Sequence, residues 1–250
     1  MNLFIPPVAN MSPQFIVSRL FSCIAFLLTC SILVDALKFV FHIEFNGSNF
    51  LIFLFSVNYE RNIPTFFSVL LLLFATRQLY NISFEKSILK EPYRYHWWLM
   101  TIIFFLIAAD EFMATHEMLS ELIRDKYQLG GVLYYSWVIP FGIILCLLVI
   151  SYARFIFRYL PSRIRNLMIM SAIIYIGGSM IIEMLGAYVH FYNGAEDMTY
   201  ILLTNVEEGM EMCGIVVFIY TLALYNEKPL HQRDNLNVKE NQQVMATPDQ

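Results

Sequence analysis

Residues 97–118 read WWLMTIIFFLIAADEFMATHEM, and this stretch decides the class of the fold. It is long enough and apolar enough to cross a bilayer as a helix, which takes about 20 residues. Its second half nevertheless carries three acids and a histidine, Asp110, Glu111, His116 and Glu117. One piece of sequence therefore predicts both a membrane-spanning helix and a set of ionisable groups inside or beside it.

The composition of the whole chain is that of a membrane protein. Of the 250 residues, 58% are hydrophobic and only 14% are charged, whereas a soluble domain has about 25% charged residues. A net charge of −4 argues against nucleic-acid binding, because no basic surface is left to neutralise phosphates. We expect an all-α, polytopic membrane helix bundle with the lipid bilayer as its surroundings. Its six transmembrane helices are predicted at residues 15–34, 63–80, 97–118, 132–153, 166–189 and 199–224.

The basic residues predict the orientation of this bundle. Twelve of the 16 Lys and Arg residues fall on the side that holds both termini, and four fall on the other side. Because cytoplasmic loops carry the excess of Lys and Arg, both termini are predicted to face the cytoplasm. Residues 1–225 then form one six-helix transmembrane domain. The polar residues 226–250 are predicted to be a disordered cytoplasmic tail.

Acidic residues lie within or at the edge of the predicted spans, and no Lys or Arg is expected at their depth. A central acidic side chain costs about 2.5–3.5 kcal/mol on insertion scales. These side chains must therefore face the interior of the bundle. Protons, bound metal cations or a water-filled cavity must neutralise them. The acids are Asp110, Glu111, Glu117, Glu183, Glu207, Glu208 and Glu211.

Helical geometry predicts that these acids converge. At 1.5 Å per residue, three different spans place acids about 10–13 Å below their outer ends, in the outer half of the membrane. At about 100° per residue, each of these spans also carries a second candidate ligand on the same face, one or two turns away. The pairs are Asp110 with Glu117, Glu183 with His190, and Glu207 with Glu211. Glu111, His116 and Glu208 point away from these faces.

Carboxylates with imidazoles are the ligand set of Fe, Mn and Zn in proteins, and helix bundles with inward Glu and His build such sites. We therefore predict one or two bound transition-metal ions (Fe, Mn or Zn). The Glu-x-x-His signature of di-iron bundles is absent, so the number of ions stays open. The predicted ligands are Asp110, Glu117, Glu183, His190, Glu207, Glu211 and His116, with Glu111 and Glu208 hydrogen-bonding around them.

Three classes of function fit such a cluster. A redox-active metal within the membrane would suit a lipid-soluble substrate such as a quinone or an acyl chain, an argument by analogy. A proton- or cation-coupled transporter is the second class, because chains of Asp, Glu and His also relay protons. A structural or regulatory membrane subunit is the third. The inner halves of the spans offer few polar side chains, among them Thr76, Gln78 and Tyr220, which disfavours a continuous pathway.

Three short motifs carry a resemblance to a family. They are Asp110-Glu111-x4-His116-Glu117, Glu207-Glu208-x2-Glu211 and Asn62-Ile63-Pro64-Thr65. Together they resemble a group of uncharacterised bacterial membrane proteins with six spans, and the similarity extends over most of spans two to six. The resemblance implies a multi-pass protein of the bacterial inner (cytoplasmic) membrane. It implies no activity.

Overall fold

The computed structural model describes residues 12–39 and 48–245, and over these residues the chain forms helices and turns only. The helices that are long and apolar enough to cross a membrane number six, which confirms the predicted all-α bundle. The orientation of the bundle stays a prediction. The candidate spans are Pro13–Lys38, Ile63–Ile88, Arg94–Met113, Val138–Tyr159, Ser162–Asn193 and Met198–Glu227.

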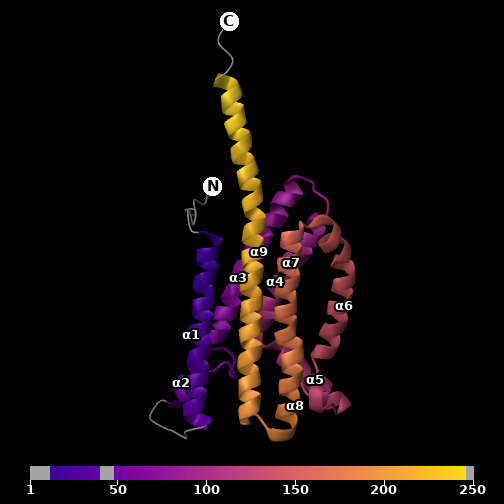
Figure 1. Ribbon diagram of the computed structural model, residues 1–250. Coiled ribbons are helices and arrows are strands. Elements are labelled where there is room, and N and C mark those ends of the chain that lie inside the picture. Colours follow the sequence, from indigo (N-terminus) through magenta and orange to yellow (C-terminus); the bar gives the residue numbers. More distant parts are fainter. Residues whose placement is uncertain (1–11, 40–47, 246–250) are drawn as a thin grey trace.

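The last helix, α9 (Met198–Met245), packs against α1, α3, α7 and α8 and forms the middle of the bundle (Figure 1). α1 begins at the end of the bundle beyond which α9 projects, whereas α2, α5 and the end of α8 gather at the opposite end, called the α5 end below. The other α-helices are α1 (Pro13–Phe39), α2 (Ser48–Phe55), α3 (Ile63–Ile88), α4 (Arg94–Met113), α5 (Thr115–Tyr127), α6 (Val138–Arg154), α7 (Ser162–Ile176) and α8 (Glu183–Asn193). Shorter elements are a 3-10 helix η1 (Gly131–Leu133) and two π-helices, η2 (Phe155–Tyr159) and η3 (Gly177–Ile182).

The start of α3 shows how local sequence builds the α5 end. The Asn62 side chain accepts a hydrogen bond from the backbone N–H of Thr65 at 3.1 Å, as helix N-caps do. Pro64 lies in the first turn, where a missing N–H costs nothing. The Asn62 amide also donates to the carbonyl oxygen of Ser56 at 2.6 Å. This cap therefore fixes the segment between α2 and α3, which carries Glu60.

The third predicted span ends earlier than the sequence indicated. α4 stops at Met113, and Ala114 adopts a left-handed conformation with φ of 53° before α5 begins. The cause is Asp110, which accepts hydrogen bonds from the Thr115 hydroxyl and from the backbone N–H of His116 and so caps α5. The prediction that Asp110 and Glu117 share one helix face is therefore wrong, because they lie on two different helices.

Two other boundaries differ from the prediction. The fourth span begins at Val138 rather than at residue 132, so that Pro140 lies in the first turn of α6. α9 continues as a helix to Met245, although the polar composition from residue 226 predicted disorder. Adding a residue to an existing helix avoids the cost of nucleation, which explains how a polar segment can continue it. Residues 246–250 of the predicted tail lie outside the described residues.

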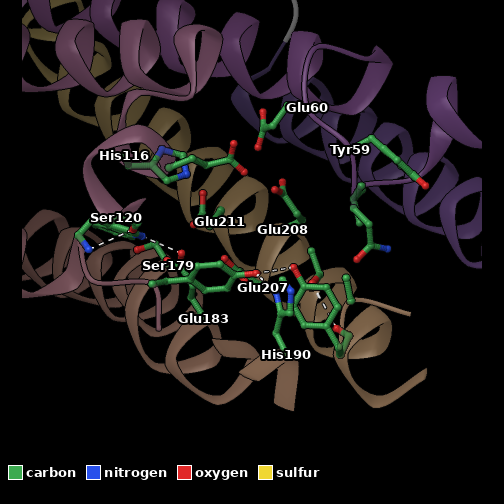
Figure 2. A pocket seen from close by; sticks show the side chains of 18 of the residues that line it. Tyr59, Glu60, His116, Ser120, Ser179, Glu183, His190, Glu207, Glu208 and Glu211 are labelled. Atoms are coloured by element: carbon green, nitrogen blue, oxygen red, sulfur yellow. Dashed lines mark hydrogen bonds between the residues drawn. The ribbon is translucent and has the colours of Figure 1, made fainter. Parts of the chain in front are cut away.

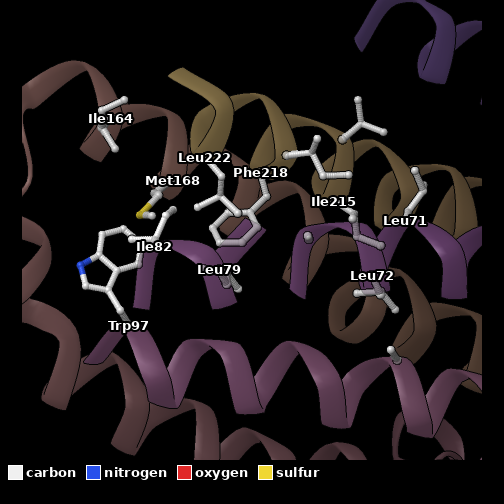
Figure 3. Close-up of a cluster of buried hydrophobic side chains, with 14 of the residues drawn as sticks. Leu71, Leu72, Leu79, Ile82, Trp97, Ile164, Met168, Ile215, Phe218 and Leu222 are labelled. Atoms are coloured by element: carbon white, nitrogen blue, oxygen red, sulfur yellow. The ribbon is translucent and has the colours of Figure 1, made fainter. Parts of the chain in front are cut away.

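An apolar core fills the half of the bundle away from the α5 end. Figure 3 shows part of this core. Helices α3, α4, α7 and α9 and the π-helix η2 contribute to it, and each side chain named below is at most 2% exposed. Within a membrane such packing is stabilised by van der Waals contact rather than by removal from water. The core includes Leu72, Leu79, Ile82, Trp97, Phe155, Ile164 and Leu222.

Candidate functional site

A cavity of about 510 Å³ lies at the α5 end of the bundle. Its walls come from α4, α5, α8, α9 and the segment before α3. Glu60, His116, Glu208 and Glu211 point into the same space (Figure 2). All nine residues that the sequence singled out line it: Asp110, Glu111, His116, Glu117, Glu183, His190, Glu207, Glu208 and Glu211. Their role as metal ligands stays a prediction.

The walls are strongly acidic. The sequence predicted no Lys or Arg beside the acids, but the cavity wall does contain basic residues. Lys38 from α1 and Arg124 from α5 both line the cavity. The Arg124 guanidinium lies over the ring of Tyr134, 4.4 Å from its centroid. The acidic lining residues are ten, counting Glu60, Glu121 and Glu196. Carboxylates therefore outnumber the Lys and Arg of the cavity wall, and the cavity favours positively charged occupants.

Asp110 holds His116. Its Oδ2 lies 3.0 Å from Nδ1 of His116, while Oδ1 accepts the Thr115 hydroxyl and the His116 backbone N–H. Burial alone lowers the pKa of the His116 imidazole, but the hydrogen bond to Asp110 and the surrounding carboxylates raise that pKa to about 9. Both oxygens of Asp110 are thus engaged, and Nε2 of His116 is the ring nitrogen left for the cavity.

His190, on α8, is also oriented by a hydrogen bond at its Nδ1 atom. Nδ1 of His190 lies 2.6 Å from the hydroxyl of Tyr135, which lies 2.8 Å from the hydroxyl of Tyr200 (Figure 2). Because Tyr135 can donate to Tyr200, it can accept the Nδ1 proton of His190 at the same time. That arrangement would leave the lone pair of Nε2 for a ligand.

Glu183 is the most buried of the lining carboxylates, at 8% exposed. Its Oε1 accepts a hydrogen bond from Nε1 of Trp137 at 2.7 Å. The backbone N–H of Trp137 in turn donates to the Ser120 hydroxyl at 3.2 Å. These contacts tie α8 to the segment before α6 and to α5, and they fix the direction of the Glu183 side chain.

Close packing of η3 on α9 positions the wall of the cavity that carries Glu183 and Glu207. A Cβ atom on Gly178 would lie 2.9 Å from the backbone oxygen of Glu207, so only glycine permits this approach. The same π-helical turn leads directly into Glu183, and π-turns are frequent at functional sites. Glu183 and His190 share α8 as predicted.

The cavity reaches around the helices rather than along one face of each. Glu111 and Glu208, which were predicted to point away from the shared faces, line it as well. So does His116. These three residues lie off the predicted shared faces and still reach the cavity, because α5 and the segment before α3 enclose the acids from additional sides.

A family model described as a domain of unknown function (DUF8692) matches residues 41–225. This chain belongs to that family. The DUF8692 region includes four of the six candidate spans completely, the last span as far as residue 225, and all nine of the predicted site residues. No curated protein and no solved structure matches the chain. The predicted membership of an uncharacterised family is therefore confirmed, while the bacterial inner-membrane location stays an expectation.

The sequence analysis did not predict several residues of the acidic cavity. Glu60 was not among the predicted site residues, yet it lines the cavity, and burial raises the pKa of its carboxyl. Tyr135 is the hydrogen-bond partner of His190, Tyr200 is the partner of Tyr135, and Trp137 donates to Glu183. The run Tyr134-Tyr135-Ser136-Trp137 offered a signal, because Tyr and Trp combine apolar rings with polar groups that seek partners when buried.

Among the residues that the structure describes, no group of three or more His, Cys, Asp or Glu side chains is arranged to hold a metal ion. In this part of the chain the site is an acidic cavity with two oriented imidazoles, and its side chains are not gathered around one ion position.

Proposed function

We propose that this multi-pass membrane protein binds one or two transition-metal ions, Fe, Mn or Zn, in the acidic cavity at the α5 end. The observation that carries the proposal is the pair of oriented imidazoles. Nδ1 of His116 faces Asp110, and Nδ1 of His190 faces Tyr135. Histidines that ligate metals usually donate one ring N–H to such a partner and bind the ion with the other nitrogen.

The ligands follow from which atoms are already engaged. His116 and His190 offer Nε2, and Glu183 offers the carboxylate oxygen that Trp137 does not contact. Glu207, Glu208 and Glu211 supply further oxygens from α9. Asp110 acts by holding His116, in place of the ligand role that the sequence suggested. Since Glu side chains have three rotatable bonds, ligation requires that they rotate toward a common point.

The chemistry of such a centre is redox or Lewis-acid chemistry supplied by the metal. The residues of the chain orient the imidazoles, accept or release protons and shape the cavity. A cavity lined in part by candidate membrane-spanning helices suits a lipid-soluble substrate, and we include such a substrate in the proposal.

Proton- or cation-coupled transport is the competing function. The apolar core (Figure 3) lies between the cavity and the opposite end of the bundle, and its side chains are all buried, at most 6% exposed. A site accessible from one end agrees better with resident metal binding than with a pathway through the bundle. This packing supports our preference for the metal over transport.

Metal content tests the proposal. The full-length protein is purified in mild detergent without chelator and without a nickel column, and its metals are quantified by mass spectrometry. We expect one or two ions of Fe, Mn or Zn per chain in wild type and in the control variant Glu85→Gln on α3, outside the cavity. His190→Ala and Glu207→Gln should lose most of this metal. Folded wild-type protein without metal would overturn the proposal and favour transport.

A further inference from the structure

A second polar cluster lies beside the cavity, between α1, α9 and the segment after α2. Its centre is Asp35 on α1, whose side chain is 1% exposed. Oδ2 of Asp35 accepts a hydrogen bond from the Asn58 amide at 3.1 Å and one from the Ser31 hydroxyl at 3.5 Å. Ser56 and Asn205 also interact with this carboxylate. Asp35 and Asn205 do not line the acidic cavity, whereas Asn58 does.

Three oxygen atoms in this cluster are buried and have no hydrogen-bond partner among the described residues. They are Oδ1 of Asp35, Oδ1 of Asn58 and Oδ1 of Asn205. Asn205 is itself only 5% exposed, and its amide nitrogen donates to the Ile201 carbonyl at 2.9 Å. All three atoms are acceptors. Buried polar atoms are nearly always paired, so three unpaired acceptors in one cluster need an explanation.

The charge of the cluster needs a partner too. Within residues 12–39 and 48–245, the side chains that interact with Asp35 are Ser31, Ser56, Asn58 and Asn205, and all four are neutral. Carboxylates within membrane-spanning helices are costly, and they mark sites that bind ions or protons. A proton on Asp35 would satisfy only one of the two amide oxygens, because it supplies a single donor.

We propose that Asp35, Asn58 and Asn205 bind a monovalent inorganic cation of the sodium type. Carboxylate, amide and hydroxyl oxygens are the ligands that hard cations prefer. One carboxylate balances one positive charge, which favours a monovalent ion over a divalent one. In the proposed site the cation is the common partner of all three unpaired oxygens. The Ser31 and Ser56 hydroxyls complete an oxygen-lined site.

This sodium-type site is independent of the proposed metal site. It contains no imidazole and only one acid, whereas the cavity contains two imidazoles and ten acids. The two sites also draw on different ligand atoms of α9, since Asn205 lies at the first and Glu207, Glu208 and Glu211 at the second. Each proposal can therefore fail without the other.

Thermal unfolding in sodium tests the inference. The full-length protein in mild detergent, treated with a chelator of divalent metals, is titrated with NaCl in place of choline chloride at constant ionic strength. We expect Tm to rise and saturate, by roughly 3 °C, because an ion that binds only the folded state stabilises it. Binding of radioactive Na⁺ should saturate at about one ion per chain.

Variants separate this site from other effects of salt. Asp35→Asn and Asn205→Ala should abolish both the Tm rise and the binding of radioactive Na⁺. The control Glu183→Gln, in the acidic cavity, should retain both. Helical circular dichroism verifies folding, and Asn205→Ala decides alone if Asp35→Asn does not fold. A wild-type Tm equal in NaCl and choline chloride overturns the inference. A sodium response that survives in Asn205→Ala, or disappears only in Glu183→Gln, overturns it as well.

Discussion

Asp110 illustrates how a single side chain can be assigned to the right site with the wrong role. Its place in the acidic cavity followed from its depth in the third span, but its two oxygens hold the Thr115 hydroxyl, the His116 backbone and the His116 ring. Sequence spacing on an assumed continuous helix could not show this. The contacts of Asp110 with Thr115 and His116 depend on the left-handed conformation of Ala114. Alanine ordinarily continues an α-helix.

The Asp110–His116 pair predicts a pH dependence of stability. The pKa of His116 is about 9 in the folded protein against an ordinary value of 6.5. A raised folded-state pKa contributes stability that is fully present below pH 6.5 and is lost as the pH rises through 9. In chelator-treated protein, Tm should therefore fall between pH 6.5 and 9 more steeply in wild type than in His116→Gln. Equal slopes in the two proteins would contradict this account of the pair.

The Tyr135 hydroxyl predicts a loss of metal affinity when it is removed. Tyr135→Phe leaves Nδ1 of His190 without its 2.6 Å partner, and losing such a partner typically weakens metal binding about 10–100-fold. Competition with a chromogenic chelator measures the affinity. Tyr134→Phe, which removes the neighbouring phenol hydroxyl, should bind metal as wild type does. Equal affinity in both variants would show that Tyr135 does not orient His190.

At the scale of elements, the start of α3 and the break after α4 differ in how far sequence could predict them. Asn62 and Pro64 are recognisable start signals, and α3 begins at Ile63 as expected. The break at Ala114 carries no such signal, because alanine has the highest helix propensity of all residues. The caps that cause it come from side chains on both sides of the break.

Ala114→Gly tests that break. Glycine removes the strain of a left-handed alanine, about 1–2 kcal/mol, while the loss of a buried methyl group offsets part of the gain. We expect the free energy of unfolding to rise by about 0.5 kcal/mol. The matched change Ala108→Gly, inside α4, should lower it by about 1 kcal/mol. If Ala114→Gly destabilised the protein as much as Ala108→Gly, residues 97–118 would form one helix.

For the whole molecule, hydropathy and charge were enough to predict six spans and that their acids meet in one place. They could not predict the walls that loops and short helices add. Glu60 comes from the segment before α3 and Trp137 from the segment before α6, and neither position follows from the periodicity of a span. Helix periodicity also placed Glu111 and Glu208 off the shared faces. They still line the cavity, because the loops and short helices enclose it from more sides than the spans alone.

Orientation is a property of the whole molecule, and labelling can test it. Glu196→Cys lies between α8 and α9, and Lys90→Cys lies between α3 and α4, at the opposite end of the bundle. Both positions are exposed. With both termini in the cytoplasm, a membrane-impermeant maleimide should label Glu196→Cys in intact bacterial cells and Lys90→Cys only after permeabilisation. The reverse pattern would place the acidic cavity on the cytoplasmic side.

The central claim is that the acidic cavity binds a transition metal through His116 and His190. Anomalous X-ray scattering from crystals of the metal-loaded protein, recorded on both sides of the metal's absorption edge, locates such an ion directly. The account predicts one or two peaks in the cavity, each about 2.0–2.2 Å from Nε2 of His116, of His190 or of both, with glutamate oxygens of α8 or α9 completing the shell. A peak elsewhere in the protein, or no peak in crystals of loaded protein, would contradict it.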